Sequence, residues 1–303
     1  MKNFYKQILK IASVFLLGVI LFLADYYGFG AVRGLEFNNE AEALHLYLLD
    51  VGQGDAILLK TPENQYLLFD GGANNLVLNE LGRVLPANQR FLDYLFLTHP
   101  HSDHVGGLPA ILENYEVGEV FQTGVLHTSA DYLKFLEALK NLNIKNQIVA
   151  GAQSLDLAGG VGVEFLFPLS DFSGQKVENL NLTSLVVRVS YQGQSVLLMG
   201  DAEIPVEGEI LEAKKQDLES LQAGLIKIGH HGSKTATGFE WLNAVKPSQA
   251  LVSCGLDNSF NHPHAELLKK LNYRNLTVWR SDQQGMIHCW TKSGEAWQCE
   301  SER

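Results

Sequence analysis

The chain has 303 residues, of which 46% are hydrophobic and 19% are charged, which is ordinary for a globular protein with a large core. Its net charge of −11 argues against a protein that binds nucleic acid through a basic surface. It does not exclude nucleic acid as a substrate, because bound divalent cations can reverse the local field. Three cysteines exclude a disulfide-rich scaffold and a cysteine-rich zinc site.

The first 30 residues have the pattern of a membrane segment. Lys2, Lys6 and Lys10 precede an uncharged, mostly apolar run over 11–24. The stretch 8–27 is about long enough to cross the ~30 Å hydrocarbon core as a helix, and the lysines favour the cytoplasmic side. We therefore expect a membrane anchor and linker over 1–33, with a folded domain over 34–303 outside the cytoplasm. A cleaved signal peptide, which would make the protein secreted, and a soluble core helix are the alternatives.

After the linker, short apolar strands alternate with helices. The first half predicts strands at 44–49, 56–59, 66–69 and 94–97, a helix beginning at 108–112 and a helix over 132–142. The second half predicts strands at 185–191, 195–199, 225–228, 250–253 and 276–279, helices over 204–223, 239–245 and 265–271, and a C-terminal hairpin. Strands between helices in both halves predict two sheets packed face to face with helices outside.

The cysteines lie in the second half of the chain. Cys289 and Cys299 flank a turn at Ser293-Gly294 and would be neighbours on the hairpin. Outside the cytoplasm they can pair, and two buried thiols fit the sequence equally well. Cys254 follows an apolar run and is expected in the core.

The strongest chemical signal is the segment THPHSDHVGG over 98–107. Its histidines and aspartate suit zinc or another first-row divalent metal. These candidate ligands are His99, His101, Asp103 and His104. Alternate spacing directs His99 and His101 toward one point, while Asp103 and His104 turn toward a second. A polar surface loop without metal is the alternative, but this pattern rarely arises by chance.

One loop cannot close two metal sites, so further ligands are expected at other strand ends. The strand QSVLLMGD ends at Asp201, whose carboxylate could bridge two cations or cap the following helix. The strand LIKIGHHGS ends in His230 and His231, and successive side chains of a strand face opposite ways. One of the two should therefore be a ligand, and we favour His231; the other would contact substrate or support the ligands. Two cations about 3.5–4 Å apart can share a water and lower its pKa, which suits hydrolysis of a phosphoester, lactone or thioester.

These motifs resemble the metallo-β-lactamase superfamily and, more specifically, the extracytoplasmic domain of ComEC competence proteins. LDVGQGDA over 49–56 is similar to the DVGQGD signature of that branch, and LLFDGG over 67–72 to the first superfamily motif. Asn181 with Ser184, then 199–203, 229–233 and His262-Pro263-His264 follow in the family's order. The resemblance covers about residues 44–290.

The resemblance implies an αββα four-layer sandwich, an α+β fold, that is a metal-dependent hydrolase. It implies one zinc or manganese ion held by His99, His101 and Asp201. It implies a second held by Asp103, His104, Asp201 and a histidine of the 230–231 pair, with Asp103 also taking part in catalysis and Asp70 behind the ligands. His127 is the only histidine between 108 and 181 and is interpreted as non-ligating, which leaves one metal open to substrate.

Further residues are expected to line the cleft. His262 precedes a helix and is expected to contact a substrate phosphate, or else to be a polar residue at the helix start. Asp55, as a catalytic residue, and Gln53 lie in a glycine loop and either contact substrate or form the turn. Asn181, Ser184 and Asp282 would support the site or the substrate.

The expected function is that of an anchored, extracytoplasmic phosphodiesterase or DNA nuclease, with single-stranded DNA as a substrate. The alternatives are a cell-surface small-molecule phosphodiesterase, similar to choline-phosphate esterases, and a non-catalytic metal-binding assembly factor of DNA uptake. A nuclease should present basic side chains near the metals, and few stand near the motifs beyond Lys227, Lys234 and Arg280. ComEC proteins carry this domain beside a many-helix channel, whereas this chain has one hydrophobic segment at most, so DNA uptake would need a separate channel partner.

Overall fold

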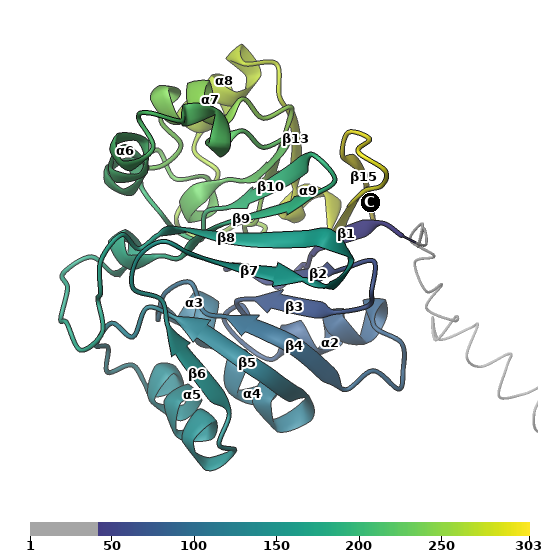
Figure 1. Ribbon diagram of the computed structural model, residues 1–303, viewed down its shortest axis with the longest axis vertical. Helices are drawn as coiled ribbons and strands as arrows, with labels where there is room; N and C mark the ends of the chain where they lie inside the picture. The colour runs from purple at the N-terminus through teal and green to yellow at the C-terminus, as the bar shows by residue number, and fades with distance from the viewer. Residues whose placement is uncertain (1–41) are drawn as a thin grey trace, which may run out of the picture. The chain divides into compact units, whose positions relative to one another are not determined.

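The computed structural model describes residues 42–303, whose strands form two sheets with helices on both sides (Figure 1). The anchor expected over 1–33, and the boundary expected at 34, lie outside the described residues. Within 42–303, no helix has both the length and the apolar character that crossing a membrane requires.

The first sheet has the strand order β15-β14-β1-β2-β3-β4-β5-β6. Its strands are β1 (Leu44–Leu48), β2 (Ile57–Lys60), β3 (Tyr66–Phe69), β4 (Phe91–Phe96), β5 (Glu116–Gln122), β6 (Lys145–Ile148), β14 (Ile287–Thr291) and β15 (Gln298–Ser301). Neighbours from β15 to β3 pair antiparallel, and neighbours from β3 to β6 pair parallel. The parallel part places the carboxyl ends of β3 and β4 at one edge.

The second sheet has the order β13-β12-β11-β10-β9-β8-β7. Its strands are β7 (Gln153–Leu157), β8 (Val161–Phe167), β9 (Val186–Tyr191), β10 (Gln194–Leu198), β11 (Leu225–Lys227), β12 (Gln249–Val252) and β13 (Thr277–Arg280). Strands β10 to β13 pair parallel, so the carboxyl ends of β10, β11 and β12 also share an edge.

The two sheets pack face to face through alternate side chains of their strands. Leu44, Leu46 and Leu48 of β1 belong to the same buried cluster as Val163 and Phe165 of β8. Successive strand residues face opposite sides, so the residues between these leave the other face of each sheet for helices.

Helices cover both outer faces. They are α2 (Leu76–Val84), α3 (Ser102–Val105), α4 (Leu108–Asn114), α5 (Ala130–Asn141), α6 (Ile204–Ala213), α7 (Phe239–Val245), α8 (Ala265–Tyr273) and α9 (Ser281–Gln284). Short 3-10 turns are η1 (Ala158–Gly160), η2 (Leu180–Thr183), η3 (Leu218–Leu221) and η4 (Gly229–Gly232). Figure 1 shows α2, α4 and α5 beside the first sheet and α6, α7 and α8 beside the second. The αββα sandwich predicted from the sequence is confirmed.

Several parts of the sequence-based assignment differ from the structure, and α2 and β5 lie in stretches that were left unassigned. The helix predicted over 204–223 is wrong in length, because α6 ends at Ala213 and the chain re-forms only the short turn η3. Residues 212–213 and 215–219 are exposed, so a longer helix would have little apolar surface to bury there. The stretch 143–184, left unassigned, contains β6, β7 and β8.

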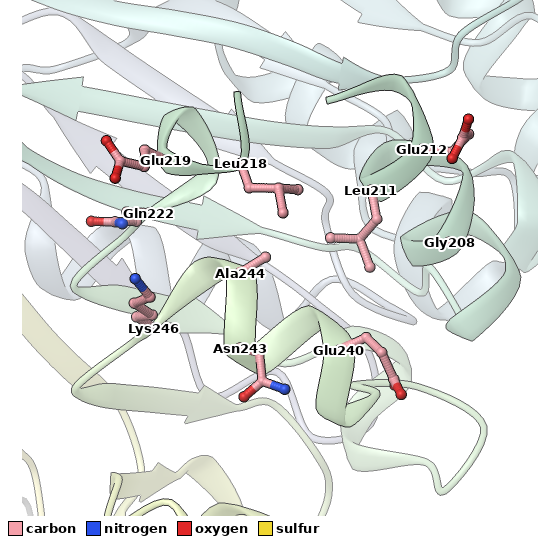
Figure 2. A pocket seen from close by; sticks show the side chains of 10 residues that line it. All are labelled: Gly208, Leu211, Glu212, Leu218, Glu219, Gln222, Glu240, Asn243, Ala244 and Lys246. Atoms are coloured by element: carbon pink, nitrogen blue, oxygen red, sulfur yellow. The ribbon is translucent and has the colours of Figure 1, made fainter. Parts of the chain in front are cut away.

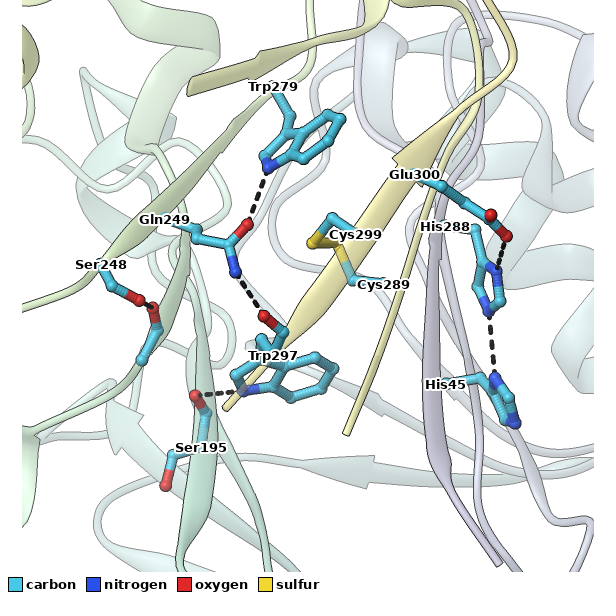
Figure 3. The surroundings of a disulfide bond; sticks show 11 residues. His45, Ser195, Ser248, Gln249, Trp279, His288, Cys289, Trp297, Cys299 and Glu300 are labelled. Carbon is cyan, nitrogen blue, oxygen red and sulfur yellow. Dashed lines mark hydrogen bonds and ion pairs between the residues drawn. A yellow bond between two sulfur atoms is a disulfide. The ribbon is translucent and has the colours of Figure 1, made fainter. Parts of the chain in front are cut away.

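The C-terminal hairpin is joined by a disulfide between Cys289 and Cys299, which are direct partners across β14 and β15 (Figure 3). Of the two interpretations left open, the structure has the bonded pair. Trp297 on the same hairpin donates its indole N–H to the Ser195 carbonyl at 2.9 Å, which ties the hairpin to the second sheet. Cys254 is buried, as expected.

Candidate metal centre

The candidate centre lies where strands of both sheets end. Asp70 follows β3, the 98–104 segment follows β4, Asp201 follows β10 and the histidine pair follows β11. Because β3–β4 and β10–β11 are parallel pairs, each sheet presents its loops at one edge. Ligand sites in such sheets form outside the carboxyl ends of the strands.

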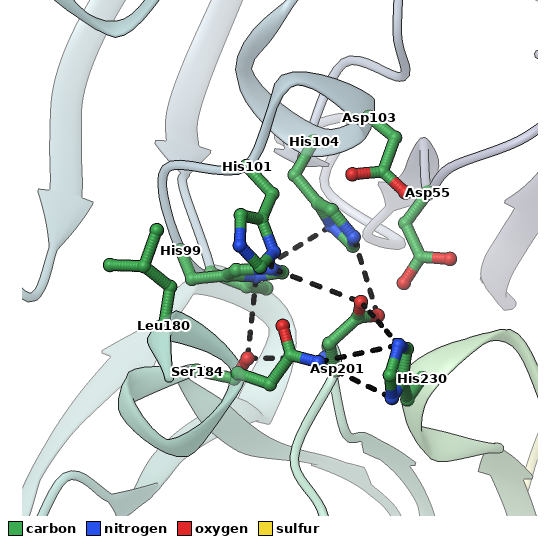
Figure 4. Close-up of polar contacts among 12 residues, drawn as sticks. Asp55, His99, His101, Asp103, His104, Leu180, Ser184, Asp201 and His230 are labelled. Atoms are coloured by element: carbon green, nitrogen blue, oxygen red, sulfur yellow. Dashed lines mark hydrogen bonds and ion pairs between the residues drawn. The ribbon is translucent and has the colours of Figure 1, made fainter. Parts of the chain in front are cut away.

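The THPHSDH segment changes backbone conformation partway along. His99 and His101 precede α3, and His101 is extended, with φ −66° and ψ 147°. Asp103 and His104 lie on the first turn of α3, so their side chains leave in a different direction. Figure 4 shows His99, His101 and His104 gathered above Asp201, with Asp103 to one side.

Three groups of potential metal-binding side chains result among the described residues. One consists of His104 with Asp55 and Asp70, which lie behind the centre, and the other two share Asp201. In one of these two, His99, His101 and Asp201 place a ligand atom each within 4.8 Å of one another. In the other, Asp103, His104, Asp201 and His231 do the same. The candidate ligands thus gather in the two groups into which the sequence analysis divided them, and their role as ligands stays a prediction.

The two oxygens of Asp201 face different groups. Oδ1 lies 3.3 Å from Nε2 of His104 and 3.3 Å from Nε2 of His231, whereas Oδ2 lies 3.8 Å from Nε2 of His99. Oδ1 is buried and has no hydrogen-bond partner among the described residues. A buried carboxylate oxygen without a partner is costly, and a divalent cation would satisfy it. The alternative role as a helix cap is wrong, because Glu203 holds the N-cap position of α6.

Neighbouring polar groups orient the histidines from behind. Nδ1 of His104 lies 2.7 Å from Oδ2 of Asp70, and Asp70 accepts from the hydroxyl and the N–H of Thr98 at 2.7 and 2.8 Å. Nδ1 of His231 lies 3.0 Å from the Ser253 carbonyl, which makes this nitrogen the donor and leaves Nε2 free. Such partners fix the tautomer of a ligand histidine. Asp70 therefore has the supporting position that the resemblance implied.

Ser184 supports the first group in a similar way. Its hydroxyl lies 3.3 Å from Nδ1 of His99 and accepts the N–H of Asp201 at 3.2 Å. One side chain thus contacts both a candidate ligand and the backbone of the shared aspartate.

The histidine pair lies in the turn η4 and not on a strand, so the reason given for separating them was wrong. His230 and His231 have φ of 47° and 51°, a left-handed backbone conformation that residues other than glycine rarely adopt. Such strain persists where the surroundings enforce it and is frequent at functional sites. His231 joins the second group, whereas Nδ1 of His230 lies 3.0 Å from Oε1 of Glu203 and Nε2 lies 3.9 Å from Asp201.

Asp55 is not placed as a residue that touches substrate. It is 2% exposed and forms an ion pair with the fully buried Lys227, whose ammonium also donates to the Gly200 carbonyl at 2.9 Å. Its Oδ1 lies 3.3 Å from Nδ1 of His231. Gly54 before it packs so closely that a Cβ there would lie 2.0 Å from the Asp103 carbonyl oxygen, so glycine is required. The glycine loop thus supports the metal-binding loop.

The remaining predicted residues fall into two sets. Asn181 and His262 adjoin the centre: the amide nitrogen of Asn181 lies 3.3 Å from His230, and the His262 ring centre lies 5.4 Å from that of His230. Gln53 and Asp282 are engaged elsewhere. Gln53 accepts the N–H of Gly255 at 3.2 Å, and Asp282 makes a two-pronged ion pair with Arg280.

His127 lies outside both groups. Its ring centre is 6.5 Å from that of His101, and its Nδ1 is 3.0 Å from the Ser129 hydroxyl. It does not belong to any group of potential ligands among the described residues. Its non-ligating role stays a prediction.

The charges of the centre are strongly coupled. Burial alone would lower the pKa of His104 and His231, but Asp201 and the other carboxylates raise both pKa values well above the usual range. Burial alone would likewise raise the pKa of Asp103, but His104 and His231 hold it well below its usual value. Burial lowers the pKa of His99, and the neighbouring His104 lowers it further. The protons on two histidines thus supply positive charge that bound cations would replace.

Glu203 and Ser253 were not singled out as site residues from the sequence. Glu203 contacts His230, accepts from the Thr235 hydroxyl at 2.6 Å and lies 3.0 Å from the Asn179 amide. Its place two residues after Asp201, inside a quoted motif, was the available signal. Ser253 acts through its backbone carbonyl, for which a side-chain pattern gives no signal.

A separate cavity of about 540 Å³ lies between α6, η3 and α7 (Figure 2). Leu211, Leu218 and Ala244 line it, together with Glu219 and other polar side chains. No candidate metal ligand lines this cavity, so it is distinct from the metal centre.

Comparisons with known proteins agree with the motifs and the fold. A model of the metallo-beta-lactamase superfamily matches residues 49–255. ComE operon protein 3 of Bacillus subtilis is 28% identical over 258 residues, 79% of this chain and 32% of that protein. Competence protein ComA of Neisseria gonorrhoeae is 31% identical over 241 residues, 78% of this chain and 31% of that protein. The chain therefore spans about a third of the length of these curated relatives.

A solved structure with the same fold is the metallo-beta-lactamase fold protein YhfI of Bacillus subtilis. It superposes with a TM-score of 0.52 at 15% identity, covering 86% of this chain and 100% of that one. At this identity the likeness concerns the fold alone.

Proposed function

The chain belongs to the metallo-beta-lactamase superfamily of metal-dependent hydrolases, and we propose that it is an extracytoplasmic phosphodiesterase that cleaves single-stranded DNA. The observation that carries the proposal is the pair of ligand groups that share Asp201, with one of its oxygens facing each group. The donors are imidazole nitrogens and carboxylate oxygens, which suit both zinc and manganese. When bound, two such cations lower the pKa of a water and stabilise negative charge on a phosphoryl oxygen.

The chain's own residues would position the diester. His230 and His262 adjoin the ligands without belonging to either group. Glu203 holds Nδ1 of His230, so Nε2 of that ring is the atom on the side of Asp201. A phosphate placed beside these rings would accept a hydrogen bond from the N–H of His262, and from Nε2 of His230 only when that nitrogen carries a proton.

The supply of basic side chains is smaller than the sequence suggested. Lys227 is fully buried against Asp55, and Arg280 is paired with Asp282. Lys234 is exposed and makes no ion pair with any described residue. With a net charge of −11, the chain is poorly suited to track a long duplex by charge. This supports a short contact with a flexible strand, and the competence proteins among the relatives make DNA the substrate to test first.

We also propose that the catalytic domain acts outside the cytoplasm. The disulfide between Cys289 and Cys299 supports this, because such bonds persist mainly in oxidising compartments. Anchoring by the lysine-led N-terminal segment, and a separate channel partner for DNA uptake, belong to the same proposal.

The test uses the full chain loaded with Mn²⁺ or Zn²⁺ and assays a single-stranded DNA oligomer beside bis(p-nitrophenyl) phosphate. Asp201→Ala should abolish both activities. His127→Ala, a histidine near the centre but outside both groups, is the matched control and should retain them. Cleavage of the small diester alone would replace the nuclease by a small-molecule phosphodiesterase. Bound metal without any cleavage would indicate a non-catalytic assembly factor.

A further inference from the structure

Phe260 is an aromatic side chain held at the rim of the centre with 58% of its surface exposed. Its ring lies nearly parallel to that of His262, with an interplanar angle of 23° and ring centres 5.8 Å apart. His262 in turn lies 5.4 Å from His230 and 6.3 Å from the candidate ligand His231, centre to centre. The ring of His262 therefore lies between Phe260 and the histidines of the candidate metal centre.

The loop that carries Phe260 is fixed at both ends. Asn258 accepts the N–H of His262 at 2.9 Å and donates to the carbonyls of His262 and Gly255 at 2.6 and 2.8 Å. Gly255 is bound in turn to Gln53 of the glycine loop. A fixed aromatic ring loses little conformational freedom when a ligand binds, which makes it an effective contact.

We infer that Phe260 is a stacking platform for a nucleobase of the substrate, set beside His262 so that the adjoining phosphate reaches the metals. The inference rests on the proposed function and adds how the single-stranded substrate is recognised. Every base offers a π-face, and stacking on aromatic side chains recognises single strands without regard to sequence. Stacking also needs no positive surface, which fits an acidic chain whose nearby cations are mostly paired.

The exposure of Phe260 is otherwise unexplained by packing. Single exposed rings are common on protein surfaces, so the place of Phe260 carries the inference, because its ring stacks on His262 beside the candidate ligand His231. A quaternary ammonium group could also stack on such a ring through a cation–π interaction. The two ligands differ in chemistry, so one experiment separates them.

The experiment compares two oligomers of equal length with the Mn²⁺-loaded full chain: one of thymidine nucleotides, and one with the same backbone but no bases. Phe260→Ala should lower kcat/KM on the thymidine oligomer about tenfold or more, as expected for the loss of one stacked base, and leave the abasic oligomer nearly unchanged. Phe260→Tyr should retain the wild-type preference. Leu256→Ala is the matched control, because Leu256 is 69% exposed in the same loop and carries no ring. Metal content of each variant shows that the centre is intact.

Equal losses on both oligomers would overturn the platform while leaving the nuclease in place. If Phe260→Ala lowered kcat/KM only for glycerophosphocholine, the ring would bind a quaternary ammonium group, and the nucleobase platform would be overturned. If the wild type cleaves neither oligomer, the proposed function fails, and binding by fluorescence anisotropy still decides the platform. In that case, tighter binding of the thymidine oligomer that Phe260→Ala removes supports the platform, and equal binding of both oligomers overturns it.

Discussion

The buried ion pair of Lys227 and Asp55 allows a direct test of whether Asp55 acts on substrate or supports the centre. We consider Lys227→Met, which keeps the length of the side chain and removes its charge. The ammonium is fully buried, contacts the Asp55 carboxylate and donates to the Gly200 carbonyl. Its loss leaves the buried carboxylate of Asp55, 2% exposed, without its ammonium partner, and the imidazole of His231 remains beside it.

The structure sets the expected magnitudes. Removing one member of a buried pair typically costs about 3–5 kcal/mol, whereas replacing both members by uncharged groups is often close to neutral. Lys227→Met and Asp55→Asn should therefore each lower the free energy of unfolding by about 3–5 kcal/mol. The double variant should lose only about 1–2 kcal/mol, because the Gly200 carbonyl remains without its donor. The double variant is then more stable than either single variant.

Urea unfolding of the metal-free chain measures these values without a contribution from metal binding. If the double variant lost as much free energy of unfolding as the two single variants together, the two charges would not compensate each other. Diester hydrolysis by the metal-loaded variants gives a second result. If Asp55 only supports the loop and His231, the double variant should recover activity relative to the singles. If Asp55 touches substrate, stability should return without activity.

Three further predictions concern the centre and the fold. Asp201→Ala should lower the metal content of the purified chain from two ions to one or none, because each of its oxygens faces a different ligand group; mass spectrometry that still finds two would refute the shared role. Burial raises the pKa of Glu207 from 4.5 to about 7, so its folded state holds a proton that the unfolded state releases, and stability should fall as pH rises from 4.5 to 7. At about 1.4 kcal/mol per pH unit this amounts to about 3 kcal/mol, and Glu207→Gln should reduce the fall in stability by this amount in unfolding curves recorded from pH 4.5 to 8. Replacing both Cys289 and Cys299 by serine should cost roughly 2–3 kcal/mol in the same assay, since the bond closes a loop over a sequence separation of 10; an unchanged midpoint would show that the bond does not form.

The fold could be predicted where the sequence is strongly patterned. Buried strands such as β3 (YLLF) and β10 (QSVLL) are mostly apolar and lead into Asp70 and into Gly200-Asp201, and they were placed within a residue. The strands β6 and β7 were missed because most of their residues are exposed, so neither an apolar run nor a regular alternation marks them. The length of α6 was misjudged because its polar continuation has helix-forming residues without a surface to pack on.

The site shows the same division between local and distant information. The ligands His99 to His104 lie within six residues, so their spacing alone indicates a metal site. Which of His230 and His231 faces the candidate ligands depends on the left-handed backbone of both residues. Their residue types do not predict this conformation. The pairing of Asp55 with Lys227 joins residues far apart in sequence. The sequence alone therefore leaves Asp55 between substrate contact and turn formation, and places Lys227 only among the basic residues near the motifs.

The charge balance of the centre connects these residues to the class of substrate. The potential metal-binding groups contain four carboxylates, those of Asp55, Asp70, Asp103 and Asp201, and the ammonium that compensates them is that of Lys227. With neutral histidines this set carries three negative charges, which explains why the surrounding carboxylates raise the pKa values of His104 and His231. Two divalent cations in place of those protons would leave the set with one positive charge. Loss of a proton from a bound water would make the set neutral. A phosphodiester carries one negative charge per phosphate and a phosphomonoester about −2 at neutral pH, so the proposed diester would bring the smaller excess of negative charge into a buried site.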